Sequence, residues 1–123
     1  MKKNYPSENV ISKMRDMLSI ASDMTRLKIM LCLLDESKCH CDCNSGHTHC
    51  GMCEERPCMI EKCVSEIVAD TNASQSLISH QLKVLKDFDL VSTRRDGKKI
   101  YYSLKDGQVK QLISVVLEHA MED

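Results

Sequence analysis

The sequence predicts a mainly helical α+β domain with five helices and one two-stranded β-hairpin. Two observations predict this fold: apolar residues recur at helical spacing in five segments, and the spacing changes to alternate residues only after Leu90. A third observation is a cysteine-rich stretch, residues 38–62, which interrupts the pattern between the second and third helices. At 123 residues the chain can bury one core, so we expect a single domain over residues 1–123 that contains this insert.

The first three helices follow from apolar spacing and from helix-start signals. Residues 8–20 place apolar side chains three or four positions apart, as one face of a helix requires. A second helix is expected to start near Asp23, because aspartate is a strong N-cap, and to carry the apolar residues of 27–34. Helical spacing then predicts a short third helix, which can begin as early as Pro57 and is broken at residues 71–72.

The fourth predicted helix has one apolar face and one polar face. It starts after Ser74, a good N-cap, and runs to about Phe88. At about 100° per residue, Ile78, Leu82 and Leu85 fall on one face, which we expect to be buried. The opposite face carries short hydrogen-bonding side chains, which suit a helix lying in a DNA major groove. The candidate DNA-contacting residues on this helix are Gln75, Ser76, Ser79, His80 and Lys83.

A basic hairpin and a last helix complete the pattern. Residues 91–104 alternate apolar and polar positions, and Asp96-Gly97 is a strong signal for a two-residue turn between strands. The candidate phosphate-binding residues at its tip are Arg94, Arg95, Lys98 and Lys99. A last helix over residues 106–121 has a long apolar stripe. A short helix, a tight break, a polar-faced helix and a basic hairpin, in this order, predict a winged helix-turn-helix, which is a DNA-binding fold.

Charge is informative in its distribution rather than in its total. The net charge is −1, yet residues 80–110 contain eight lysines and arginines against four aspartates. The chain begins with a polar segment and has no apolar run long enough for a signal peptide or a membrane span. We therefore expect a cytoplasmic protein that does not enter a membrane, in a reducing compartment where thiols stay free or bind metal.

Four stretches of the sequence carry a family resemblance. They are ASDMTRLKI at residues 21–29, SQSLISHQLKVL at 74–85, RRDGK at 94–98 and YYSL at 101–104. In these stretches the chain resembles the ArsR–SmtB family of bacterial and archaeal repressors, which release DNA when they bind metal or another stress signal. The resemblance implies a homodimer built on the first and last helices, whose two recognition helices meet a palindromic operator in double-stranded DNA.

The sequence departs from this family at the third helix. Members often carry Glu-Leu-Cys-Val-Cys-Asp-Leu there, whereas residues 61–67 read EKCVSEI. Cys63 matches the first metal-binding cysteine of such members, but Ser65 replaces the second, and about twenty extra residues precede the motif. The usual third-helix metal site therefore cannot be carried over whole.

The family's other metal site lies on the last helix, between two subunits. Its pattern maps onto Asp106, His119 and Glu122, with Gln108 where histidine is usual. Gln108 and His119 would lie about 16 Å apart along one helix, so only an antiparallel partner helix could bring them together. Losing an imidazole weakens a zinc site, and we expect these residues mainly to form a polar margin of the dimer interface.

The insert carries the clearest chemical signal. Seven of the eight cysteines fall within residues 39–63, with hardly any aliphatic residue among them, so the stretch cannot form a core. Clustered thiolates, with steps such as Cys50-Gly-Met-Cys53, bind zinc or another thiophilic metal ion. The candidate ligands are Cys39, Cys41, Cys43, Cys50, Cys53, Cys58 and Cys63. Their spacing selects neither a set of four nor a metal, and Cys32, alone on the second helix, is expected to be a packing residue.

Three functions remain open, and the sequence ranks them. The leading one is a sequence-specific DNA-binding repressor whose operator affinity is controlled by a thiophilic metal ion bound to the insert. The alternative is a winged-helix regulator with a structural zinc site that senses another signal, such as thiol oxidation. The third is a metal buffer or a thiol redox enzyme. A metal buffer has no need of a recognition helix, and a thiol redox enzyme would place its Cys-x-x-Cys motif in a βαβ unit, which this sequence does not show. We therefore expect no enzymatic activity.

Overall fold

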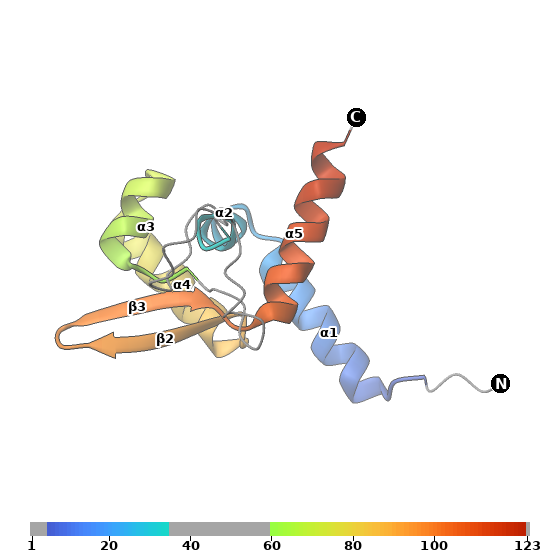
Figure 1. Cartoon of the computed structure of the whole chain (residues 1–123). Helices are drawn as coiled ribbons and strands as arrows, with labels where there is room; N and C mark the ends of the chain where they lie inside the picture. Colours follow the sequence, from blue (N-terminus) through green and yellow to red (C-terminus); the bar gives the residue numbers. More distant parts are fainter. Residues whose placement is uncertain (1–4, 35–59, 123) are drawn as a thin grey trace, which may run out of the picture.

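The computed structural model describes residues 5–34 and 60–122. Within these ranges the chain forms five helices and a three-stranded antiparallel sheet with the order β1-β3-β2. The helices are α1 (Glu8–Ala21), α2 (Met24–Cys32), α3 (Val64–Thr71), α4 (Gln75–Asp87) and α5 (Gly107–Met121). The strands are β1 (Lys62–Cys63), β2 (Val91–Asp96) and β3 (Lys99–Leu104). Figure 1 shows α1 and α5 on the right of the molecule and the β2–β3 hairpin on the left.

Side-chain caps fix the starts of four of the five helices in the described ranges. An oxygen of the residue just before the helix accepts a backbone N–H from the first turn, which leaves one fewer N–H without a partner. The capping residues are Ser7, Asp23, Ser74 and Asp106. The starts that the sequence predicts for the second, fourth and last helices are therefore confirmed.

The third helix begins later than predicted. It starts at Val64, and the two residues before it form β1, in which Lys62 pairs with Tyr102 and Cys63 with Tyr101 of β3. Cys63 has extended backbone angles, φ −84° and ψ 170°, and its N–H donates to Glu66 Oε1 at 3.1 Å. Strand pairing before Val64 thus replaces the helical turn that periodicity suggests, and the sheet has three strands instead of two.

The hairpin is present, but its turn lies one residue beyond the predicted one. Pairing of β2 with β3 continues to Asp96 opposite Lys99, so the two turn residues are Gly97 and Lys98. Gly97 has φ +63° and stands first in the turn. Hairpin turns with glycine at the first position need positive φ only there, whereas an Asp-Gly turn would need it at both positions.

One core joins α2, α3, α4, the base of the hairpin and α5. Its fully buried side chains include Ile29 and Met30 of α2, Ile67 of α3, and Val91 and Leu104 of the strands. The rest of the hairpin extends beyond this core, which is why the alternating pattern of residues 91–104 produces burial only at its base. None of the helices in the described ranges is both long enough and apolar enough to cross a membrane.

Candidate nucleic-acid interface

A tight turn sets α4 against α3. The last residue of α3 is Thr71, and Asn72 then adopts the left-handed conformation, with φ 57°, that ends many helices. Its N–H donates to the carbonyl of Val68 at 2.8 Å, while Ser74 caps the next helix by accepting from Leu77 N–H at 3.2 Å. Only three residues therefore separate the two helices, as in a helix-turn-helix.

The two faces of α4 differ as the sequence predicts. Ile78, Leu82 and Leu85 are 0% exposed and form part of the core. Every one of the predicted DNA-contacting residues on this helix is exposed: Gln75, Ser76, Ser79, His80 and Lys83. The structure thus presents a row of short polar side chains and one cation on one face of α4, in a form that can enter a major groove.

Arg26 joins α4 to α1, a link that sequence reasoning missed. Its Nη1 donates to Gln81 Oε1 of α4 at 2.6 Å, and its Nε donates to the carbonyl of Ile20 at 2.7 Å. Ile20 lies in the last turn of α1, where carbonyl groups have no partner within the helix. One guanidinium therefore ties α1, α2 and α4 together. Arg26 belongs to the stretch at 21–29 that carries the family resemblance, which was the only sequence signal for it.

Arg26→Ala is expected to lower the free energy of unfolding by about 1–3 kcal/mol, because it leaves a side-chain amide and a helix-end carbonyl without their donor. Operator affinity should fall with it, since the orientation of α4 loses a constraint. Urea denaturation and DNA titration measure the two effects. Arg26→Lys keeps the charge but cannot span both acceptors, and it should recover only part of the loss. Wild-type stability in both variants would show that the link is dispensable.

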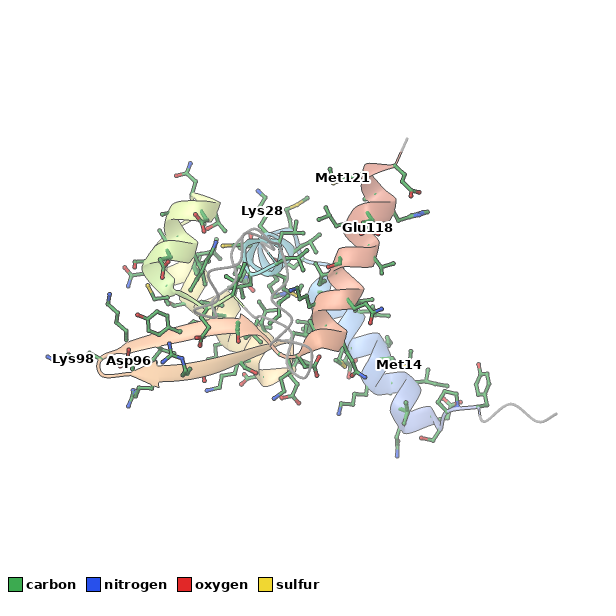
Figure 2. The ribbon with its side chains drawn as sticks, in the orientation of Figure 1. Met14, Lys28, Asp96, Lys98, Glu118 and Met121 are labelled. Carbon is green, nitrogen blue, oxygen red and sulfur yellow. The ribbon has the colours of Figure 1, made fainter. Side chains whose placement is uncertain are left out.

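The β2–β3 hairpin, called the wing below, carries its predicted cations on the surface. Arg94, Arg95, Lys98 and Lys99 are all exposed. Figure 2 shows Asp96 and Lys98 at the hairpin tip, far from α5. Arg94 is fixed by two contacts. Its Nε donates to Glu61 Oε2 at 2.7 Å, and its guanidinium lies 4.9 Å from the centre of the Tyr101 ring. The hydrogen bond to Glu61 raises the pKa of Arg94.

Of the seven cysteines predicted to bind metal, Cys63 is the one that the described ranges include. It is buried, and its Sγ lies 3.1 Å from Ser65 Oγ and donates to Glu66 Oε1 at 3.2 Å. The backbone and side-chain hydrogen bonds from Cys63 lower the pKa of Glu66. The other six predicted ligands lie outside the described residues: Cys39, Cys41, Cys43, Cys50, Cys53 and Cys58.

The described residues supply at most part of a metal site. Among them, no three His, Cys, Asp or Glu side chains gather closely enough to hold an ion. Cys63 and Glu66 offer one sulfur and one oxygen donor, both of which zinc accepts, so a four-coordinate site here needs further ligands from elsewhere.

The predicted set on the last helix does not come together within one chain. Asp106 caps the start of α5, where its Oδ1 accepts from Val109 N–H at 3.0 Å. His119 and Glu122 lie at the other end of the helix, with Nδ1 and Oε2 4.0 Å apart. Only a second subunit could combine the two ends.

Cys32 packs against the core, as predicted, and is also hydrogen-bonded. Its Sγ donates to Asp70 Oδ2 at 3.2 Å, and Lys62 Nζ lies 3.5 Å from the same sulfur. Burial and the hydrogen bond to Asp70 raise the pKa of Cys32 to about 11. The thiol therefore stays protonated at neutral pH, which makes it a poor nucleophile and a poor metal ligand.

Helices α1 and α5 leave an apolar surface uncovered in the single chain. A cavity of about 380 Å³ lies between them and is lined by Met17, Leu18 and Leu112 among others. Of the lining residues, Leu18 is 54% and Leu112 is 43% exposed, and α1 and α5 carry further apolar side chains that are 48–55% exposed: Val10, Met14, Val115 and Val116. Figure 2 labels Met14 on α1. The surface has the position that the family resemblance implies for a dimer interface.

Part of the chain is similar to known regulatory proteins. Residues 60–93 match the family described as bacterial regulatory protein, arsR family. A transcriptional repressor SmtB homolog from Synechocystis is 42% identical over 62 residues, which cover 50% of this chain and 47% of that relative. A cadmium resistance transcriptional regulatory protein CadC homolog from Staphylococcus aureus is 37% identical over 62 residues, covering 50% of this chain and 51% of that relative. The chain thus spans about half the length of the relatives it matches.

Solved structures share the fold over nearly the whole chain. HlyU from Vibrio cholerae has a TM-score of 0.69 at 23% identity, and the match covers 94% of this chain and 100% of HlyU. A homodimeric winged helix-turn-helix DNA-binding domain from Mycobacterium bovis has a TM-score of 0.68 at 20% identity, over 96% of this chain and 90% of that one. These likenesses confirm the winged helix-turn-helix fold.

Proposed function

We propose that the chain is a homodimeric repressor of the ArsR–SmtB family of winged helix-turn-helix regulators, which binds operator DNA and releases it when a thiophilic metal ion binds. The match of residues 60–93 to the arsR family and the similarity to the SmtB and CadC homologs support this proposal. The observation that carries the proposal is the contrast on α4 between a fully buried face and an exposed polar face. Such a helix beside a basic hairpin fits a major groove and its flanking phosphates.

Contacts to DNA divide between two elements. The exposed residues of α4, from Gln75 to Lys83, would read base edges, and the wing cations would bind phosphates. The phosphate contacts supply sequence-independent affinity that salt weakens, while α4 supplies the preference for an operator. A second subunit, docked on the exposed faces of α1 and α5, would place a second α4 on the other half of a palindrome.

Metal control is proposed to act through the cysteine-rich insert. Zinc or another thiophilic ion would take its ligands from Cys39, Cys41, Cys43, Cys50, Cys53, Cys58 and Cys63. Cys63 stands at the start of α3, and α3 packs against α4. A metal bound at Cys63 would therefore act on the helix next to the one that we propose contacts DNA. The name of one relative links it to cadmium resistance, which supports a thiophilic ligand. For Asp106, His119 and Glu122 we propose a place at the margin of the dimer interface.

Neutralising the wing cations tests the DNA-binding surface. Each of Arg95→Gln, Lys98→Gln and Lys99→Gln should weaken binding to operator and random duplexes alike. Each should also flatten the slope of log affinity against log salt by about one unit, because one phosphate contact is lost. Fluorescence anisotropy at several salt concentrations measures both effects. Lys28→Gln, an exposed cation on α2, is the control and should leave the slope unchanged. An unchanged slope after all four wing cations are replaced would refute the assignment.

A further inference from the structure

One row of side chains crosses the three-stranded sheet. Arg94 of β2 pairs with Tyr101 of β3, and Tyr101 pairs with Cys63 of β1, so these residues are lateral neighbours and lie on the same face. Glu61 is two residues before Cys63, and an extended chain returns to the same face every second residue. The end of the insert and the wing therefore share one surface.

The Arg94 side chain reaches across this row. Its guanidinium lies over the Tyr101 ring of the middle strand, and its Nε donates to Glu61, which precedes the strand at the far edge. The Arg94 side chain is 53% exposed and that of Glu61 is 32% exposed, so DNA can reach the pair. The contact joins residues that are 33 positions apart in sequence.

We propose that Glu61 competes with DNA phosphate for Arg94, and that this contact sets the strength with which the wing binds DNA. The inference rests on the proposed DNA-binding function and adds a regulator of the same site. A guanidinium already paired with a carboxylate presents little net charge to a phosphate, so the wing acts with one cation fewer than its sequence suggests. Exposed ion pairs are weak, so losing this pair costs little stability, but while it persists Arg94 makes no phosphate contact.

This contact lies where the insert meets the DNA-binding surface. Glu61 belongs to the segment that leads into β1, and pairing of β1 with β3 holds that segment beside the wing. Displacement of this segment would separate Glu61 from Arg94 without any change in α4. Wing affinity and groove recognition can therefore be adjusted separately.

A double-mutant cycle on the full chain tests the proposal. Glu61→Gln, Arg94→Gln and the double variant are titrated by fluorescence anisotropy, at several salt concentrations, with a duplex selected for binding from a random pool. Glu61→Gln should bind about two- to fivefold more tightly at low salt, as expected for loss of an exposed competing ion pair. Its salt slope should be steeper by about one phosphate contact. In the Arg94→Gln background the same change should have no effect on slope.

Asp96→Asn is the matched control, because it removes a negative charge from the same hairpin without removing the partner of Arg94. Its effect should persist when Arg94 is replaced. Thermal unfolding of Glu61→Gln should match wild type. A Glu61→Gln variant that binds like wild type, or that gains equally in the Arg94→Gln background, overturns the inference and leaves the proposed function intact. Failure of the wild-type chain to bind any duplex in a salt-dependent way overturns both.

Discussion

Replacing Cys50 and Cys53 together by serine is expected to leave a folded dimer that still binds operator DNA but no longer responds to metal. The change removes the clearest Cys-x-x-Cys step of the insert and leaves α4, the wing and the described core intact. Coupling between two sites in such proteins needs about 1–3 kcal/mol, which corresponds to a 5- to 150-fold change in affinity. In the double variant, adding metal should therefore leave operator affinity unchanged. Operator titrations with and without zinc or cadmium measure it.

Cys32→Ser is the control for the loss of a thiol. Because Cys32 is hydrogen-bonded and its pKa is raised to about 11, this change should preserve the metal response. If the Cys50/Cys53 double variant unfolds or loses DNA binding, the metal is structural, and the regulator senses another signal such as thiol oxidation. If the variant responds to metal as wild type does, the ligands lie elsewhere in the chain.

Val116→Asp is expected to dissociate the dimer and to lower operator affinity by at least about 100-fold. The Val116 side chain is 53% exposed in the single chain and belongs to the apolar face that we assign to the partner. Two uncompensated carboxylates in one interface cost several kcal/mol each, which exceeds what the remaining contacts recover. A monomer also loses the avidity of two linked recognition helices. Sedimentation velocity and DNA titration measure the two effects.

Ser114→Asp is the matched control for this substitution. It adds the same charge to α5 at a position roughly 160° round the helix from Val116, at about 100° per residue. This variant should remain dimeric. A dimeric Val116→Asp protein would place the interface on another surface.

His119→Ala should keep the metal response. If this variant lost the metal response, the regulatory site would lie at the dimer interface.

The elements that sequence predicts well are those fixed by neighbours in the chain. Ser74 and Asp106 cap their own helices through contacts three residues away, so the caps and the helices follow directly from local sequence. The buried and exposed faces of α4 follow from the 3.6-residue period alone. These local rules cover the recognition helix and the position of the hairpin, which is most of the candidate DNA-binding surface.

The features that sequence missed depend on partners distant in the chain. Lys62 and Cys63 form a strand only because β3 lies beside them, and two residues are too few to show a period. The Arg26–Gln81 and Glu61–Arg94 contacts join residues 55 and 33 positions apart. The spacing of apolar residues along the chain cannot predict contacts between side chains so far apart in sequence. The one-residue error at the turn has a local cause, since Asp96-Gly97 and Gly97-Lys98 both contain the glycine that a positive φ requires.

Leu34 and Ile60 are the described residues on either side of residues 35–59, which hold most of the insert, and both are 6% exposed. Leu34 belongs to the core and Ile60 is also buried, so changes in the number of residues between them need not reach α4. Lengthening a connection is thermodynamically mild, at about 0.6 kcal/mol for each doubling. Evolution could therefore vary the chemistry of the signal and the sequence of the operator as two nearly independent traits. The two traits stay coupled at β1, the two-residue strand that pairs with β3 of the wing.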